Sequence, residues 1–222
     1  MRVSMLAAVV LCAGCGLAAA DVIVNDGQFA DGTWMAEELP TAASGSFAQR
    51  GASGGNPGAA WSVAHFEFSP GITSSLVHRE LTTSYEFGVD GGIPIALRYR
   101  VDARANGGID PFRQELRFLV TEDGIDYVST ASVVISESTW ITRNSGFLTI
   151  NDFQRLDGGA GVPNFTGELR FGFVTRIAPT PESIPKLSST GYDNFRLEVI
   201  VPGPGTLSLL AAGGLVATRR RR

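Results

Sequence analysis

Residues 168 to 177 read Glu-Leu-Arg-Phe-Gly-Phe-Val-Thr-Arg-Ile, so that bulky apolar side chains alternate with polar or small ones. The side chains of a β-strand point alternately to the two faces of its sheet, whereas those of a helix repeat every 3.6 residues. A period of two over this stretch therefore predicts a strand with Leu169, Phe171, Phe173, Thr175 and Ile177 on a core.

The same period recurs along the chain, and glycine pairs separate the segments that carry it. Core-facing rows are expected at Ile95, Leu97, Tyr99 and Val101, at Leu116, Phe118 and Val120, and at Phe195, Leu197 and Val199. Further strands are expected at residues 61–68, 78–88, 126–135 and 146–150. No segment between Asp21 and Ile200 has apolar residues at helical spacing over three turns. These patterns predict an all-β fold, an antiparallel β-sandwich of the jelly-roll kind.

Length and composition agree with one globular domain. The chain has 222 residues, of which 44% are hydrophobic, with 13 Phe, 4 Tyr and 3 Trp to fill a core. This composition excludes a disordered or collagen-like chain, and the lack of long apolar runs excludes a polytopic membrane protein.

The N-terminus has the features of an export signal. Arg2 is followed by an apolar stretch from Val3 to Leu17 and by three alanines before Asp21. Residues 1–20 are therefore expected to be a signal peptide, which signal peptidase removes to expose Asp21. An alternative is a lipoprotein that is modified at Cys15. Both cysteines lie in this leader, so the mature chain is expected to have neither a disulfide nor a thiol catalyst.

The C-terminus combines a proline-rich start, an uncharged segment and a basic end. Val201-Pro202-Gly203-Pro204 precedes the uncharged residues 206–218, which are followed by Arg219, Arg220, Arg221 and Arg222. Terminal arginines stay on the cytoplasmic side. Counted from Val201, the uncharged stretch is 18 residues, and as a helix of ~27 Å it just spans a bilayer. Residues 201–222 are therefore expected to form a single transmembrane sorting helix. The alternative is a frayed basic tail or a nucleic-acid arm.

This order of motif, apolar segment and arginine cluster resembles the PEP-CTERM sorting signal, although Gly203 stands where that family usually has Glu. The resemblance implies recognition and cleavage by an exosortase-type membrane protease. It also implies an exported protein that is held briefly in the membrane and then reaches the cell surface or the extracellular matrix.

The segment between the two ends is acidic. Arg2 and the four terminal arginines are five of the 18 basic residues, which leaves 13 against 22 acidic residues, a net charge of −9 for residues 21–200. An acidic exported body repels nucleic acid and anionic lipid, so neither is expected as a partner.

The two ends of this body carry a second resemblance. Residues 25–34 resemble the opening of galactose-binding-like jelly rolls, the fold of many carbohydrate-binding modules; they read Asn-Asp-Gly-Gln-Phe-Ala-Asp-Gly-Thr-Trp. Residues 192–197 resemble the closing strand of the same fold. The resemblance implies that the first and last strands lie close together, and family members often hold a structural calcium there. Asp193 matches the family's closing-strand ligand, whereas Ala30 replaces the usual acid after Phe29.

Calcium needs six to eight oxygen ligands, and Asp26, Asp31 and Asp193 together with loop carbonyls can supply them if the terminal strands meet. The alternative is turn chemistry, because Asp-Gly pairs at 26–27 and 31–32 are typical of tight turns.

A polysaccharide is the expected ligand of such a body, and an exposed aromatic ring would cover the apolar face of a sugar. The candidates are Trp34, Trp61, Tyr127 and Trp140. Core packing is the alternative for each, since large aromatic side chains dominate sandwich interiors. Trp34 lies beside turn residues and is expected to be the most exposed.

Catalytic patterns are weaker. Glycosidases need two carboxylates at a defined separation, and Glu115, Glu122, Asp123 and Glu168 lie on expected strands or strand ends. Residues 51–55 match a nucleophile-elbow pattern without a strand-to-helix context, and His65 and His78 have no metal-ligand spacing. We therefore expect a non-catalytic, exported protein; the alternatives are a secreted polysaccharide hydrolase and a structural matrix protein without a ligand.

Overall fold

The alternation in residues 168–177 builds the central strand of one sheet, β12 (Glu168–Ile177), whose predicted apolar row is buried throughout. The computed structural model describes residues 19–27, 29–39, 44–67, 75–108, 114–177 and 186–202. Within this part of the chain, Ala20–Val201 form one compact unit. The expected signal peptide and sorting helix lie outside the described residues, except for Ala19, Ala20, Val201 and Pro202.

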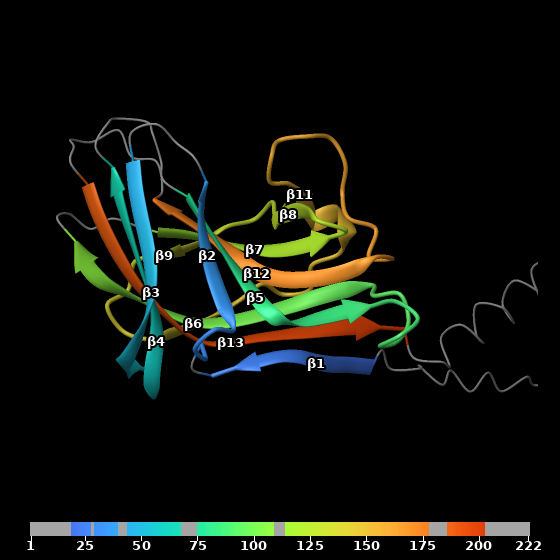
Figure 1. Cartoon of the computed structure of the whole chain (residues 1–222), viewed down its shortest axis with the longest axis horizontal. Helices are drawn as coiled ribbons and strands as arrows, with labels where there is room; N and C mark the ends of the chain where they lie inside the picture. The colour runs from blue at the N-terminus through green and yellow to red at the C-terminus, as the bar shows by residue number, and fades with distance from the viewer. Residues whose placement is uncertain are drawn as a thin grey trace, which may run out of the picture. The chain divides into compact units, whose positions relative to one another are not determined.

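The described strands form two sheets (Figure 1). Sheet A has the order β10-β6-β13-β4-β3, with β1 also paired to β13. Its strands are β1 (Ala19–Asp26), β3 (Ser44–Gly55), β4 (Gly58–Glu67), β6 (Ala96–Gly108), β10 (Ile141–Asn144) and β13 (Lys186–Val201). Every sheet A ladder with an assigned register is antiparallel.

Sheet B has the order β11-β8-β7-β12-β5-β2, with β9 also paired to β7. Its strands are β2 (Trp34–Leu39), β5 (Ser75–Glu86), β7 (Gln114–Glu122), β8 (Ile125–Ser129), β9 (Val133–Ile135), β11 (Phe153–Arg155) and β12. Its ladders are also antiparallel. The prediction of an antiparallel two-sheet sandwich is therefore confirmed.

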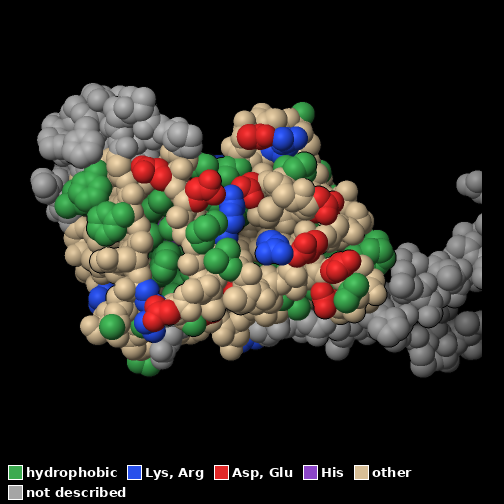
Figure 2. All heavy atoms as spheres, viewed as in Figure 1, with side chains coloured by type: hydrophobic (Ala, Val, Ile, Leu, Met, Phe, Trp, Pro, Cys, Tyr) green, Lys and Arg blue, Asp and Glu red, His purple; other side chains and the backbone are tan. Residues whose placement is uncertain are grey.

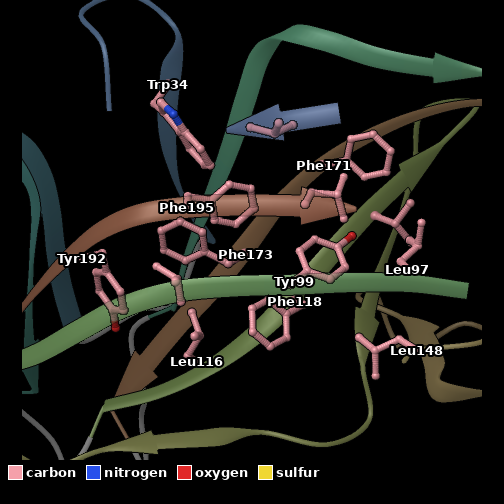
Figure 3. Packing of buried hydrophobic residues seen from close by; sticks show 14 of the residues in the cluster. Trp34, Leu97, Tyr99, Leu116, Phe118, Leu148, Phe171, Phe173, Tyr192 and Phe195 are labelled. Carbon is pink, nitrogen blue, oxygen red and sulfur yellow. The ribbon is translucent and has the colours of Figure 1, made fainter. Parts of the chain in front are cut away.

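Aromatic side chains from the two sheets meet in the core (Figure 3). The ring of Tyr99 on β6 stacks on Phe118 of β7 at 4.8 Å, and its hydroxyl donates to the carbonyl oxygen of Leu119. Phe173 of β12 contacts both Tyr192 and Phe195 of β13. Burial of each such ring stabilises the fold by about 1.5–3 kcal/mol, so these contacts hold the sheets together.

The first and last strands are neighbours, as the galactose-binding-like resemblance implies. β1 pairs with β13, and Figure 1 shows the two side by side. Outside the strands, the one helix among the described residues is the 3₁₀ turn η1 (Ile150–Asp152). No helix in the described ranges is long and apolar enough to cross a membrane.

Three details of the predicted strands were wrong. Ile95 is 50% exposed, because the strand begins at Ala96 and Ile95 joins the sheet only through its N–H bond to the carbonyl of Ile200. Residues 126–135 form two strands, because the Ser129 hydroxyl accepts from the N–H of Phe118 and donates to the carbonyl of Ala131, which ends β8. Residues 146–150 contribute only a bridge between Leu148 and Leu97.

Candidate functional site: the outer face of sheet A

Three of the four aromatic residues that were predicted to bind sugar lie in the core. Trp34 is only 6% exposed, so the expectation of an exposed Trp34 is wrong. It opens β2 on the inward side, its ring packs against Phe195 at 4.9 Å (Figure 3), and its Nε1 donates to Asp26 at 2.8 Å. Trp61 and Tyr127 are also buried. Local turn residues therefore did not decide where the indole of Trp34 points.

Trp140 differs from the other two tryptophans because it lies at the surface of sheet A. It directly precedes β10 and is half-buried. The guanidinium of Arg104, on β6, lies 4.8 Å from the centroid of its ring, which is a favourable cation–π geometry. A Cβ atom at Gly191 of β13 would lie only 3.1 Å from Cη2 of Trp140. The absence of a side chain at residue 191 thus lets the indole rest on the outer face of β13.

Small side chains continue this face from β13 towards the edge of the sheet. Gly191 is paired with Ser62 of β4, and Ser189 is paired with Ala64. Ala64 is paired in turn with Phe47 of β3, whose ring is 47% exposed and stacks on Phe66 at 6.0 Å. On the outer face of sheet A, small residues therefore lie between Trp140 on one side and Phe47 on the other. We call them the small-residue floor: Ser62, Ala64, Ser189 and Gly191.

Polar groups surround the indole of Trp140. Arg104 donates from Nε to the side-chain oxygen of Asn106 at 3.1 Å and from Nη2 to the carbonyl of Gly54 at 3.0 Å. A hollow of about 350 Å³ adjoins them, lined by Arg104, Ala105, Asn106, Gly107 and Ser138. An apolar ring beside a few fixed donors and acceptors is suited to bind a sugar, which has an apolar face and hydroxyl groups at its edges.

The carboxylates considered for catalysis are held in structural contacts. Glu122 accepts hydrogen bonds from the backbone N–H groups of Asn164, Thr166 and Gly167 at 2.8–3.0 Å. Glu115 pairs with Arg176, and Glu168 pairs with Arg170.

These glutamates do not form a pair of the kind that glycosidases use. Glu115 and Glu122 are seven residues apart on β7, which is about 23 Å along a strand. Glu122 is paired with Leu169, the residue next to Glu168, so Glu122 and Glu168 point to opposite faces of sheet B. Asp123 is exposed in the turn after β7, with its carboxylate beside Gly167.

The residues considered for calcium each have protein partners. Oδ2 of Asp26 accepts from Trp34 Nε1, from the N–H of Ala30 and from the hydroxyl of Thr33. Asp31 is at the surface and pairs with Arg50 at 3.2 Å.

Asp193 is buried and accepts from the backbone N–H groups of Asn56 and Asn194. Burial raises the pKa of its carboxyl group, those two hydrogen bonds lower it, and the charges of Asp102 and Asp26 raise it. In the described part of the chain no group of three acidic, histidine or cysteine side chains is arranged to hold a metal ion, so Asp26, Asp31 and Asp193 do not form such a group.

The other two sequence patterns also have structural roles. Residues 51–55 are the end of β3, and the chain turns there into β4 instead of a helix. His65 and His78 are both buried, and each has its Nε2 2.9 Å from the hydroxyl of Thr175. They belong to the core, where water and ligands do not reach them.

Four residues of this face were not predicted from the sequence: Phe47, Phe66, Arg104 and Asn106. Arg104 continues the alternation of Arg98, Arg100 and Asp102 along β6, a pattern that by itself is typical of any solvent-facing side of a strand. The pairing of Arg104 with Gly191 is what makes this row part of a site, and the two residues are 87 positions apart.

No protein family and no curated protein match the sequence. Several solved structures are similar. One is the family 11 carbohydrate-binding module from Clostridium thermocellum in complex with a β-1,3-1,4-mixed-linked tetrasaccharide, with 14% identity, 82% of this chain and 95% of that chain covered, and a TM-score of 0.46. Another is the CBM22-1 xylan-binding domain of Xyn10C from Paenibacillus barcinonensis. The identity is 12%, the match covers 82% of this chain and 96% of that chain, and the TM-score is 0.43.

Proposed function

We propose that this chain is a non-catalytic polysaccharide-binding protein and that the outer face of sheet A is its binding surface. The observation that carries the proposal is the position of Trp140, the one tryptophan of the three that lies outside the core. Arg104 fixes its ring, and Gly191 leaves room beneath it.

The second support is the chemistry around the ring. Arg104 and Asn106 provide hydrogen-bonding groups next to Trp140, and the small-residue floor leads from there to Phe47. The glutamates are tied to arginines or backbone N–H groups, which makes them structural. A surface of this composition can hold a sugar chain, and within the described residues Glu115, Glu122 and Glu168 form no pair that is free to cleave it.

Binding to a panel of polysaccharides, measured by affinity gel electrophoresis, tests this function. The wild type should be retarded by at least one polysaccharide, and Trp140→Ala should abolish the retardation. Phe87→Ala removes an exposed aromatic ring that lies after β5 and should bind as the wild type does. A wild type that no polysaccharide retards, or a Trp140→Ala variant that binds normally, would refute the proposal.

We further propose that the protein works outside the cytoplasm. Residues 1–20 have the pattern of a signal peptide, and residues 201–222 have that of a PEP-CTERM-like segment, so signal peptidase and an exosortase-type protease are the expected processing partners. Mass spectrometry of the native protein should find a chain that begins at Asp21 and lacks Arg219–Arg222, at the cell surface or in the matrix. An intact chain in the cytosol would contradict export.

A further inference from the structure

The outer face of sheet A carries a second group of side chains, further along β6 and β13. Arg100 of β6 lies directly opposite Arg196 of β13, and Arg98 lies directly opposite Glu198. The neighbours of both arginines in sequence, Tyr99, Val101, Phe195 and Leu197, are buried, so the arginines point outward. Like charges at directly opposite positions destabilise a sheet unless a counter-charge is present.

Among the described residues, the carboxylate that pairs with these arginines is that of Glu198. Glu198 is buried; its Oε2 accepts from Nε of Arg98 at 2.6 Å, and its Oε1 pairs with Nη2 of Arg196 at 3.0 Å. Both oxygens of Glu198 are therefore engaged, and neither bonds to Arg100. Among the described side chains, these three arginines and one glutamate leave a local excess of positive charge, within a body whose net charge is strongly negative.

The next carboxylate along β6 is not available to Arg100. Asp102 accepts from the hydroxyl of Thr142 at 2.6 Å and from the side-chain amides of Asn56 and Asn194 at 3.2 and 2.9 Å. Within the described residues, Nε of Arg100 and Nε of Arg196 are buried and have no hydrogen-bond partner. Each of these donors has lost water and gained no protein acceptor, which is unfavourable. Both side chains are nevertheless partly exposed, so a ligand can reach the rest of each guanidinium group.

On the outer face of sheet B, most of the arginines are paired with a carboxylate. There Arg79 bonds to Asp126 at 2.6 Å, Arg170 to Glu168, and Arg176 to Glu115. Figure 2 shows acidic and basic side chains next to one another over β5, β12 and β7. Arg117 also has a buried Nε without a hydrogen-bond partner there, and the charges of Arg176 and Glu115 both act on it. In the described ladders of sheet B, however, no two arginines are directly opposite each other, and this is the difference from Arg100 and Arg196.

An exposed aromatic ring adjoins the arginines. Phe147 is 61% exposed, and the guanidinium of Arg98 lies 5.3 Å from its ring centroid. Arg98, Arg100 and Arg104 lie on the same face of β6, and Arg100 is about 13 Å along the strand from Arg104. A chain-like ligand that contacts Trp140 can therefore also reach this group.

We propose that Arg100 and Arg196 bind an anionic substituent, a carboxylate or a sulfate, of an anionic polysaccharide. The proposal rests on the polysaccharide-binding function and adds the class of ligand. Guanidinium groups bind such oxyanions through paired hydrogen bonds, and the ring of Phe147 covers the apolar face of a sugar beside them. The negative charge of the whole body disfavours a densely charged polyanion such as nucleic acid, so anionic groups spaced along sugar rings fit better.

The test compares three probes by isothermal titration calorimetry on the full chain: polygalacturonate for carboxylates, dextran sulfate for sulfates, and mixed-linkage β-glucan as the neutral polymer. The wild type should bind at least one anionic polymer more tightly than the neutral one, and added NaCl should weaken that binding. Which of the two anionic polymers binds identifies the substituent.

Arg100→Gln and Arg196→Gln should each weaken binding of the anionic polymer by about tenfold or more. Binding of the neutral polymer should stay unchanged. Arg170→Gln removes one charge from sheet B and is the matched control, which should bind as the wild type does. Circular dichroism melting shows that each variant is folded, and Arg100→Lys, which keeps the charge but loses the planar fork, should bind with intermediate affinity.

The outcomes separate the two proposals. If polymers bind in a way that depends on Trp140 while Arg100→Gln and Arg170→Gln behave alike, the anionic preference is refuted and the polysaccharide-binding function stands. If no polymer binds to the wild type, both are refuted.

Discussion

Nε1 of Trp61 donates a hydrogen bond to Nδ1 of His78 at 2.9 Å, from sheet A to sheet B. An indole N–H only donates, so Nδ1 of His78 must accept, and we assign the proton of the neutral imidazole to Nε2. Nε2 then donates to the hydroxyl of Thr175 at 2.9 Å, and this hydroxyl donates to Nε2 of His65 at 2.9 Å. The chain is fully satisfied with both histidines neutral.

The first prediction concerns stability in acid. Burial lowers the pKa of His65 to about 3; burial and the charge of His65 lower the pKa of His78 well below its usual value. Between pH 6.5 and about 3, the unfolded chain binds protons that the folded chain does not. The free energy of unfolding should therefore be highest above pH 6.5 and should fall by up to about 1.4 kcal/mol per pH unit for each histidine. Urea denaturation at pH 7.5, 5.5 and 4.5 measures this, and equal stability at all three values would contradict the assignment.

The second prediction concerns Thr175, whose hydroxyl joins the two histidines. Thr175→Val keeps the shape but leaves two buried imidazole nitrogens without partners, which should cost about 2–4 kcal/mol of stability. Thr175→Ser keeps the hydroxyl and should cost about 1 kcal/mol. Urea midpoints of the two variants decide the matter, and a Val variant as stable as the Ser variant would show that the hydroxyl is not needed.

The third prediction separates the core tryptophan from the surface one. Trp34→Ala removes a ring that packs against Phe29, Phe173 and Phe195 and should lower stability by about 3–5 kcal/mol. Trp140→Ala should cost much less, about 1 kcal/mol, since its ring lies on the surface. Thermal melting of both variants checks this, and equal losses would mean that Trp140 is also a core residue.

The fourth prediction concerns calcium, for which the described residues contain no group of three suitable side chains. A site filled at a hundred times its dissociation constant would stabilise the fold by about 2.7 kcal/mol. We expect no change in the melting temperature when calcium is replaced by EDTA. A clear loss of stability in EDTA that calcium restores would show that a site exists.

The strands of the sandwich were predictable from the sequence because alternation depends only on neighbouring residues. β12 and β13 are the best cases, since their apolar rows, from Leu169 and from Phe195, are buried as expected. The breaks were not predictable in the same way. β8 ends where the Ser129 side chain replaces a backbone partner of β7, and no local pattern distinguishes that serine from others.

The site was less predictable because it depends on register between distant strands. Trp140 was one of four candidates. Its ring lies on the outer face of the sheet because Gly191, on another strand, leaves room for it there. Trp34 was misjudged because its position beside a turn says nothing about the direction of its ring. The excess of positive charge at Arg100 becomes visible only when Arg196 is placed opposite it.

The central claim is that sugar binds on the outer face of sheet A, and the three tryptophans offer a direct test. In a ¹H–¹⁵N correlation spectrum each indole Nε1–H gives its own cross-peak. On titration with an oligosaccharide of the bound polymer, the cross-peak of Trp140 should shift, while those of Trp34 and Trp61, which are bonded to Asp26 and His78, should stay in place. Saturable binding that leaves the Trp140 cross-peak unmoved, with shifts confined to sheet B, would contradict the account.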